Sequence, residues 1–276
     1  MSISERFQEL KKQNEGALIA YVTGGDPSPK YTPKIVEALV KGGVDIVEIG
    51  IPFSDPIADG PVIQASDVRA LNAGTTPNTV LNIVREVKKT SEIPIVLLTY
   101  YNIIFRKGVG RFLEDASKSG VDGIIVADLP VEEAEEYKEN AEKNGIDTIF
   151  LASPSTSSSR LEKILRMTSG FLYLISVFGV TGIREHVSQI TIQTLKRLRH
   201  YTVNRIPLAV GFGISKPEHV KSIISYGADG AIVGSAFVKL IEEKYGDLTN
   251  ILEALTSYAK SLKAATRQEY SQAELS

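Results

Sequence analysis

The chain has 276 residues, 43% of them hydrophobic, and is long enough to bury a large core in one α/β barrel or in two small domains. Its 31 basic and 33 acidic residues leave a formal net charge of −2 without a block of like charge, which disfavours nucleic acid as a partner. It contains no cysteine, which excludes thiol catalysis, zinc–thiolate sites and disulfides.

The predicted elements begin with a helix within residues 1–14. Further along, one short phrase of glycine, an apolar residue and aspartate recurs at residues 43–47, 120–124, 145–149 and 227–231. Each phrase follows a polar, amphipathic stretch and opens an apolar run. This pattern indicates a helix stopped by a left-handed glycine and followed by a buried strand, which is the αβ joint of a parallel sheet.

Other apolar runs complete a set of eight expected strands; they lie at residues 17–22, 95–98, 171–175 and 207–210. Helical patterns occur at residues 32–41, 78–89, 110–118, 131–143, 158–167, 190–201 and 217–225, and a last helix is expected at 248–263. Repeated βα units about thirty residues apart predict a single (β/α)8 TIM barrel with an extra N-terminal helix, and a doubly wound open sheet is the competitor. No linker divides the chain, so we expect one domain over residues 1–265 and a polar tail over residues 266–276 that frays.

In such a barrel, chemistry is expected where the strands end. Glu48 ends an otherwise apolar strand. It is either a buried carboxyl group with a raised pKa, suited to general acid or base work, or an exposed residue at a strand tip. Asp55 and Asp59 follow in the next loop, where each alone fits turn chemistry, and Asp59 or Gly60 fits the cap of a short helix beginning at Pro61. Their shared loop favours a division of acid and base roles between two carboxylates.

Other chemistries find little support in the sequence. The expected strands contain no lysine, which disfavours a Schiff-base aldolase. His186, His200 and His219 fall in helical or loop segments without metal-ligand spacing; we expect them on the surface and predict no metal site. No Gly-x-Ser-x-Gly elbow is present to hold a hydrolytic serine. Carboxylates remain as the expected catalytic groups.

Two glycine-rich turns follow the seventh and eighth expected strands, at residues 211–215 and 230–235. Glycine lets backbone N–H groups approach an anion, and a helix beginning at Ser235 would attract phosphate. Barrels often bind phosphate at this position. Residues 178–182, after the sixth strand, form either a lid over the ligand or an ordinary loop.

Taken together, these segments closely resemble the tryptophan synthase α chain family. The resemblance rests on residues 21–27, 48–61, 126–130, 179–182, 211–215 and 234–235, in order over about residues 3–265. Its most specific part is the string Glu-x-Gly-x-Pro-Phe-Ser-Asp-Pro-x-Ala-Asp-Gly-Pro that begins at Glu48. The chain departs from the family at Val177, where many relatives have a basic residue, and this leaves the details of lid closure open.

The resemblance implies a lyase that cleaves indole-3-glycerol phosphate, a small phosphate ester, to indole and glyceraldehyde 3-phosphate without a cofactor of its own. It implies that indole passes to a β subunit that carries pyridoxal phosphate and makes L-tryptophan, in an allosteric α2β2 heterotetramer. By position the resemblance assigns catalysis to Glu48 and Asp59, and the substrate pocket to Tyr21, Tyr100, Tyr173 and Phe212. It assigns phosphate binding to Gly182, Gly211, Gly213, Gly234 and Ser235. It assigns the lid to Gly179, Thr181 and Gly182, and the partner interface to Pro52, Asp55 and Asn102.

Three other functions remain open at this point. One is a stand-alone lyase that releases free indole, another is a non-catalytic phosphate-binding regulatory barrel, and the third is a different phosphosugar-binding barrel enzyme. In each case we expect a cytoplasmic protein, because no apolar run approaches the roughly 18 residues that cross a bilayer and the N-terminal residues lack the pattern of a signal peptide.

Overall fold

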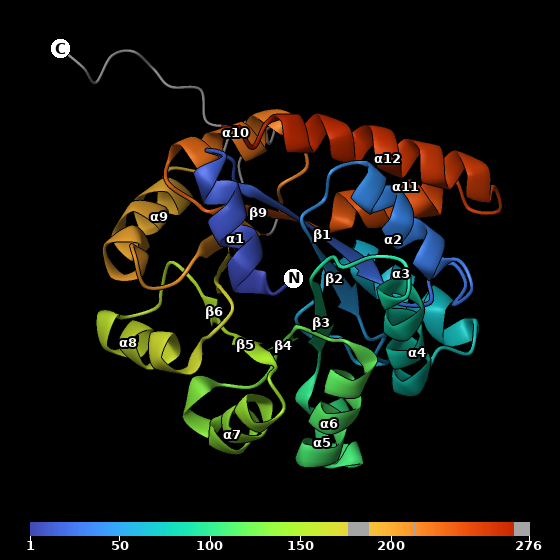
Figure 1. The fold of residues 1–276 in the computed structure, drawn as a ribbon, viewed down its shortest axis with the longest axis horizontal. Coiled ribbons are helices and arrows are strands. Elements are labelled where there is room, and N and C mark those ends of the chain that lie inside the picture. The colour runs from blue at the N-terminus through green and yellow to red at the C-terminus, as the bar shows by residue number, and fades with distance from the viewer. Residues whose placement is uncertain (176–187, 212, 268–276) are drawn as a thin grey trace.

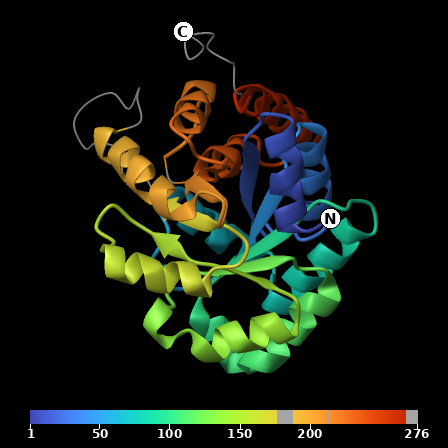
Figure 2. The ribbon, with the colours of Figure 1, turned by 60° about the vertical axis from the view of Figure 1, so that its left-hand side comes forward.

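Parallel strands form a barrel with helices around it in this computed structural model (Figure 1). The structure describes residues 1–175, 188–211 and 213–267. The predicted TIM barrel is therefore confirmed, and the open-sheet alternative is wrong, because the strands curve round until the two ends of the sheet meet (Figure 2).

The described strands are β1 Ala17–Thr23, β2 Ile46–Gly50, β3 Ile95–Thr99, β4 Gly123–Val126, β5 Asp147–Ile149, β6 Leu151–Ala152, β7 Leu172–Ile175, β8 Leu208–Gly211 and β9 Gly230–Val233. The described helices are α1 Ile3–Lys12, α2 Thr32–Lys41, α3 Pro61–Asn72, α4 Pro77–Lys88, α5 Tyr101–Lys107, α6 Val109–Ser119, α7 Glu135–Lys143, α8 Ser158–Met167, α9 Gln189–Thr202, α10 Pro217–Ser225, α11 Ser235–Glu243 and α12 Leu248–Ala264, with a 3-10 turn, η1, at Val131–Glu133.

The barrel has eight strand positions although nine strands are distinguished. β5 and β6 follow each other with only Phe150 between them, so together they occupy the fifth position. β5 pairs with β4, and β6 pairs with β7. The backbone N–H of Tyr173 also donates to the Phe150 carbonyl at 3.0 Å, which continues the pairing across the break. This divided strand closes the barrel.

The repeated glycine–aspartate phrase has a structural role at each joint. All four of its glycines have positive φ, between +67° and +98°, as the sequence predicts. In three of the phrases the aspartate also accepts a hydrogen bond from a backbone N–H of the neighbouring strand, at 2.7–2.8 Å: Asp45 from Leu18, Asp122 from Ile95, and Asp229 from Leu208. The phrase therefore fixes both the end of a helix and the register of two strands.

Helix α1 closes the N-terminal end of the barrel. Its Ile3, Phe7 and Leu10 are buried in a cluster with side chains from the barrel interior, and Phe7 packs on Phe171 with ring centroids 6.0 Å apart. The opposite end, where the strands terminate in the sequence direction, carries the loops that hold the candidate site. The extra N-terminal helix is thus confirmed, and its position directs any chemistry to the other end of the barrel.

Some elements differ from the sequence-based expectation. The helix expected at residues 131–143 is broken at Ala134 into η1 and α7. Residues 101–107, where no helix is predicted, form α5. His219 is buried, with 2% exposure, so the expectation that it lies on the surface is wrong; its Nδ1 faces the backbone N–H of Ser215 at 3.4 Å. His200 is exposed as expected, and His186 lies outside the described residues.

The chain stays packed just beyond α12. Thr266 is buried, and its carbonyl accepts the backbone N–H of Gly16 at 2.9 Å. Arg267 forms an ion pair with Glu15 at 3.0 Å. Packing therefore extends through Arg267, while the remainder of the predicted tail is not described. None of the described helices is both long and apolar enough to cross a membrane.

We expect Asp45→Ala to lower the free energy of unfolding by about 3 kcal/mol. The Asp45 side chain is fully buried, pairs with Arg6 and with Lys263 at 2.8 Å, and accepts the Leu18 N–H. Its removal leaves this backbone donor unsatisfied and takes one ion-pair partner from each cation, which keep Glu9 and Glu15. Denaturant unfolding followed by circular dichroism measures the loss. Glu253→Ala, at an exposed position on α12, is the control and should stay within about 0.5 kcal/mol of the parent; equal stability of the two variants would contradict the role of Asp45.

Candidate active site

Glu48 lies in strand β2 between Tyr21 of β1 and Val96 of β3 in the register of the sheet. It is 1% exposed, and among the described residues its Oε1 has no hydrogen-bond partner. Burial raises the pKa of this carboxyl group to about 8. Of the two alternatives left open by the sequence, the structure selects the buried one, and Glu48 is mostly a neutral acid near pH 7.

Asp59 lies in the loop between β2 and α3. The Tyr100 hydroxyl donates a hydrogen bond to Asp59 Oδ2 at 2.7 Å and accepts one from the backbone N–H of Ala58 at 3.0 Å. Burial raises the pKa of Asp59, whereas the hydrogen bond from Tyr100 lowers it. The cap of α3 is Gly60, and Asp59 makes no capping bond, so the alternative that Asp59 caps this helix is wrong.

Two tyrosines extend over glycines of neighbouring strands. A Cβ atom on Gly50 would lie 2.2 Å from the Tyr21 hydroxyl oxygen, and a Cβ atom on Gly211 would lie 2.3 Å from that of Tyr173. Only glycine leaves room for these rings. Burial raises the pKa of both phenols well above the usual value, so both stay protonated. The rings of Tyr21 and Tyr173 thus occupy the barrel next to Glu48, whose charge contributes to both shifts.

The glycine-rich turns meet the same end of the barrel. Gly234 is the cap of α11 and packs against the Tyr21 ring, with a Cβ position 3.4 Å from Tyr21 Cβ. The helix has no side-chain cap and no acidic residue in its first turn. Its first N–H groups, with the exposed Ser235, can therefore receive an anion. Gly213 has φ +74°, a conformation that favours glycine.

An ion-pair network that the sequence did not predict connects three elements around this site. Arg69 of α3 binds both oxygens of the buried Asp26, at 2.8 and 2.9 Å, and also Glu242 of α11 at 2.9 Å. Asp26 follows β1, and nothing in the local sequence pattern indicates its partner. The network holds α3, which follows the Asp59 loop, against α11, which follows the glycine turn.

A third acidic group lies close to Asp59. Asp67 of α3 is 3% exposed, and burial, followed by the charge of Asp59, raises its pKa to about 8. No motif or spacing in the sequence indicates this residue, because its burial depends on how α3 packs on the barrel. Asp67 is therefore mostly neutral near pH 7, so it places no negative charge beside Asp59 there.

The residues expected to face a partner differ in exposure. Asp55 and Asn102 are exposed, whereas Pro52 is buried. Two large apolar residues of the same segments are also exposed, Ile57 at 82% and Phe105 at 65%. Of the other expected residues, Gly179, Thr181, Gly182 and Phe212 lie outside the described part of the chain, as does Val177.

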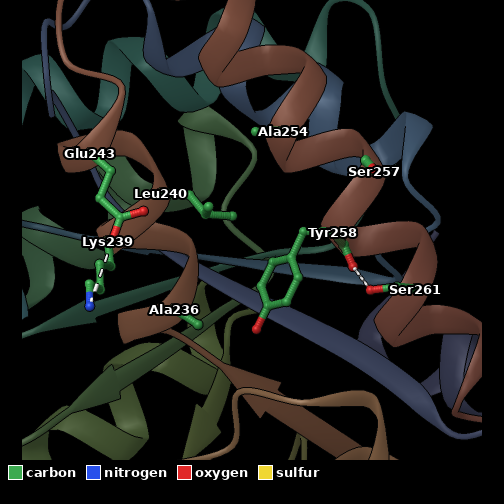
Figure 3. Close-up of a pocket in the computed structure, with 8 residues that line it drawn as sticks. All are labelled: Ala236, Lys239, Leu240, Glu243, Ala254, Ser257, Tyr258 and Ser261. Carbon is green, nitrogen blue, oxygen red and sulfur yellow. Dashed lines mark hydrogen bonds and ion pairs between the residues drawn. The ribbon is translucent and has the colours of Figure 1, made fainter.

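Two hollows lie away from these residues. One, of about 510 Å³, lies between α11 and α12, and its wall includes Tyr258 and the paired Lys239 and Glu243 (Figure 3). The other, of about 480 Å³, lies at the N-terminal end of the barrel, where Arg199 pairs with Asp229. Neither contains a proposed site residue. Within the described ranges, no group of three histidine, aspartate or glutamate side chains is arranged to hold a metal ion.

Comparison with known proteins gives one consistent result. Residues 7–267 match the family described as tryptophan synthase alpha chain. The tryptophan synthase alpha chain of Methanoregula boonei is 49% identical over 93% of this chain and 96% of its own length, and that of Methanosarcina barkeri is 49% identical over 96% and 97%. Among solved structures, the alpha chain of Legionella pneumophila superposes with a TM-score of 0.88 at 36% identity, over 98% of this chain and 99% of that one. A structure described as the tryptophan synthase α2β2 complex of Pyrococcus furiosus gives a TM-score of 0.85 at 46% identity, over 90% and 98%.

Proposed function

The chain belongs to the tryptophan synthase alpha chain family, and on this premise we propose that it cleaves indole-3-glycerol phosphate to indole and glyceraldehyde 3-phosphate. The observation that carries the proposal is the combination, at one end of the barrel, of a buried neutral carboxyl group, Glu48, and a carboxylate, Asp59, held by the Tyr100 hydroxyl. Two differently tuned carboxyl groups are what an acid–base lyase without a Schiff base or a metal requires.

Glu48 carries the proton transfers in this proposal. Its protonated carboxyl group gives a proton to the indole ring carbon that bears the glycerol chain. The carbon–carbon bond then breaks, its electron pair returns to the ring, and the adjacent glycerol hydroxyl gives its proton to the Glu48 carboxylate as the aldehyde forms. Glu48 therefore starts and ends the cycle protonated, which agrees with a pKa of about 8.

Asp59 stabilises charge in the same proposal. When the ring carbon is protonated, positive charge develops at the indole nitrogen, and an ionised carboxylate near its N–H lowers the energy of this intermediate. The Tyr100 hydroxyl favours the ionised form of Asp59. Tyr21 and Tyr173 supply aromatic walls for the indole, and the turns at Gly211, Gly213 and Gly234 with Ser235 bind the phosphate.

A tryptophan synthase β subunit is the proposed partner, in an α2β2 heterotetramer whose β subunit carries pyridoxal phosphate. The assembly named for the Pyrococcus furiosus relative supports this proposal. The exposed Asp55 and Asn102, with the exposed apolar Ile57 and Phe105, form the surface that we assign to it. Because Pro52 is buried, we assign it the role of shaping this loop rather than of contacting the partner. The cytoplasmic location stays a prediction.

Indole release from indole-3-glycerol phosphate, measured with and without a β subunit, tests the function. We expect slow release by the chain alone and a rise of at least about tenfold on mixing, because a coupling of 1–3 kcal/mol between subunits is typical of allosteric complexes. Fast release without stimulation would instead favour the stand-alone lyase. No release in either condition, together with phosphate binding, would favour the regulatory barrel.

The phosphate site gives a separate prediction. We expect Ser235→Glu to weaken binding of glycerol 3-phosphate by at least about tenfold in isothermal calorimetry, because a fixed negative charge at the start of α11 repels the phosphate. Ser257→Glu, an exposed change on α12, introduces the same charge elsewhere and should leave the affinity unchanged. Equal affinity of both variants would refute the assignment of the phosphate to α11.

A further inference from the structure

Three buried hydroxyl groups form a chain between strand β1 and helix α3. The Tyr21 hydroxyl oxygen lies 3.2 Å from Thr23 Oγ1, which lies 2.6 Å from Ser66 Oγ. Ser66 Oγ donates in turn to the Ile63 carbonyl at 2.7 Å. Thr23 is 1% exposed and Ser66 is fully buried. Neither Thr23 nor Ser66 takes part in the proposed reaction.

One direction of donation satisfies all three contacts at once. Each hydroxyl has a single hydrogen to donate, and a carbonyl oxygen only accepts. Because Ser66 gives its hydrogen to Ile63, it must accept the hydrogen of Thr23, and Thr23 must then accept that of Tyr21. The hydrogen of the Tyr21 hydroxyl therefore points toward Thr23. The lone pairs of the phenol oxygen can then accept hydrogen bonds from other groups.

That oxygen lies close to the proposed catalytic residues. It rests over Gly50, two residues after Glu48 in β2, and Tyr21 is the register partner of Glu48. Groups that donate hydrogen bonds are expected here, namely the protonated Glu48 carboxyl group and the glycerol hydroxyl of the substrate. A tyrosine held as an acceptor complements both of these groups.

The same chain also connects the two proposed catalytic segments. Ser66 lies on α3, which begins directly after the Asp59 loop, whereas Tyr21 and Thr23 lie on β1, which pairs with the strand of Glu48. A hydrogen-bonded contact between buried hydroxyls limits the movement of one element against the other.

We propose that Ser66 is a positioning residue for the cleavage reaction: through Thr23 it fixes the Tyr21 hydroxyl as an acceptor. The inference rests on the proposed function. When Ser66 is replaced by alanine, Thr23 loses its acceptor and is free to turn its hydrogen toward Tyr21. The Tyr21 hydrogen then points into the pocket, where it meets other donors.

Steady-state indole release by the full chain with its β subunit provides the test, in wild type, Ser66→Ala, Tyr21→Phe and the double variant. We expect Ser66→Ala to lower kcat/KM about tenfold, which corresponds to about 1.4 kcal/mol. In the Tyr21→Phe background the same change should alter kcat/KM by less than about twofold, because the hydroxyl on which Ser66 acts is absent. Thr23→Val should reproduce the effect of Ser66→Ala, and Thr23→Ser, which keeps the hydroxyl, should retain most of the activity.

Thermal unfolding of every variant distinguishes positioning from stability. A purely structural Ser66 would lower the melting temperature and the activity equally with and without the Tyr21 hydroxyl, and this result would overturn the proposal, as would wild-type activity in Ser66→Ala. An inactive wild type would overturn the proposed function together with this inference. An active wild type with an unaffected Ser66→Ala variant overturns the inference alone.

Discussion

Glu48→Gln should lower the rate of indole release from indole-3-glycerol phosphate by at least about a thousandfold while the fold is retained. Glutamine has nearly the same shape as glutamic acid but can neither give nor take the proton that the proposed cycle moves twice. The measurement is single-turnover release of indole at saturating substrate, with circular dichroism to verify the fold. Activity within about tenfold of the parent would refute the role of Glu48.

The same variant should be at least as stable as the parent at neutral pH. Burial raises the pKa of Glu48 from an ordinary value of 4.5 to about 8, so the folded state holds this proton more tightly than the unfolded state. The stability of the parent therefore falls as the pH rises from about 4.5 to about 8 and is independent of this group above that range. Glutamine has no such dependence. The thermal midpoints of the two proteins should coincide at about pH 4. At about pH 8 the midpoint of Glu48→Gln should be the higher of the two.

The pH profile of kcat/KM provides a further check on both carboxyl groups. Since the cycle starts with protonated Glu48, activity should fall as the pH rises through about 8. Since Asp59 must be ionised, activity should also fall on the acid side, at a pH above the ordinary aspartate range because burial raises the pKa of Asp59. The two limbs together give a bell-shaped curve that reports the free enzyme.

Much of the fold was predictable because it depends on local sequence. The helices at residues 32–41, 158–167 and 217–225 have the predicted bounds, since each begins and ends where its amphipathic pattern does. The positive φ values of the four phrase glycines follow from the same local logic. Local pattern also located Glu48 and the Asp59 loop, because an acidic residue at the end of an apolar strand is conspicuous.

The interactions that were missed join residues far apart in the sequence. Arg69 reaches Asp26 and Glu242 across three elements, and Ser66 meets Thr23 over 43 positions. Neither pair has a periodic or motif signal, because side-chain pairing between a helix and a distant strand depends on how the barrel closes. The burial of His219 was missed for the same reason, since only tertiary packing places that face of α10 inward.

Asp59→Asn should lower indole release by about a hundredfold to a thousandfold without loss of the fold, because it replaces the charge that stabilises the protonated indole ring with a neutral amide. The expected fold retention follows from the structure: Gly60, not Asp59, caps α3, and the Tyr100 hydroxyl can still donate to the amide oxygen. The fall should appear mainly in kcat, since the interaction strengthens only as charge develops on the ring. Asp55→Asn, in the same loop but exposed, is the matched control and should retain the basal rate of the free chain. If Asp59→Asn instead unfolds the chain, or raises KM alone, Asp59 serves the loop or substrate binding, and charge stabilisation must come from another group.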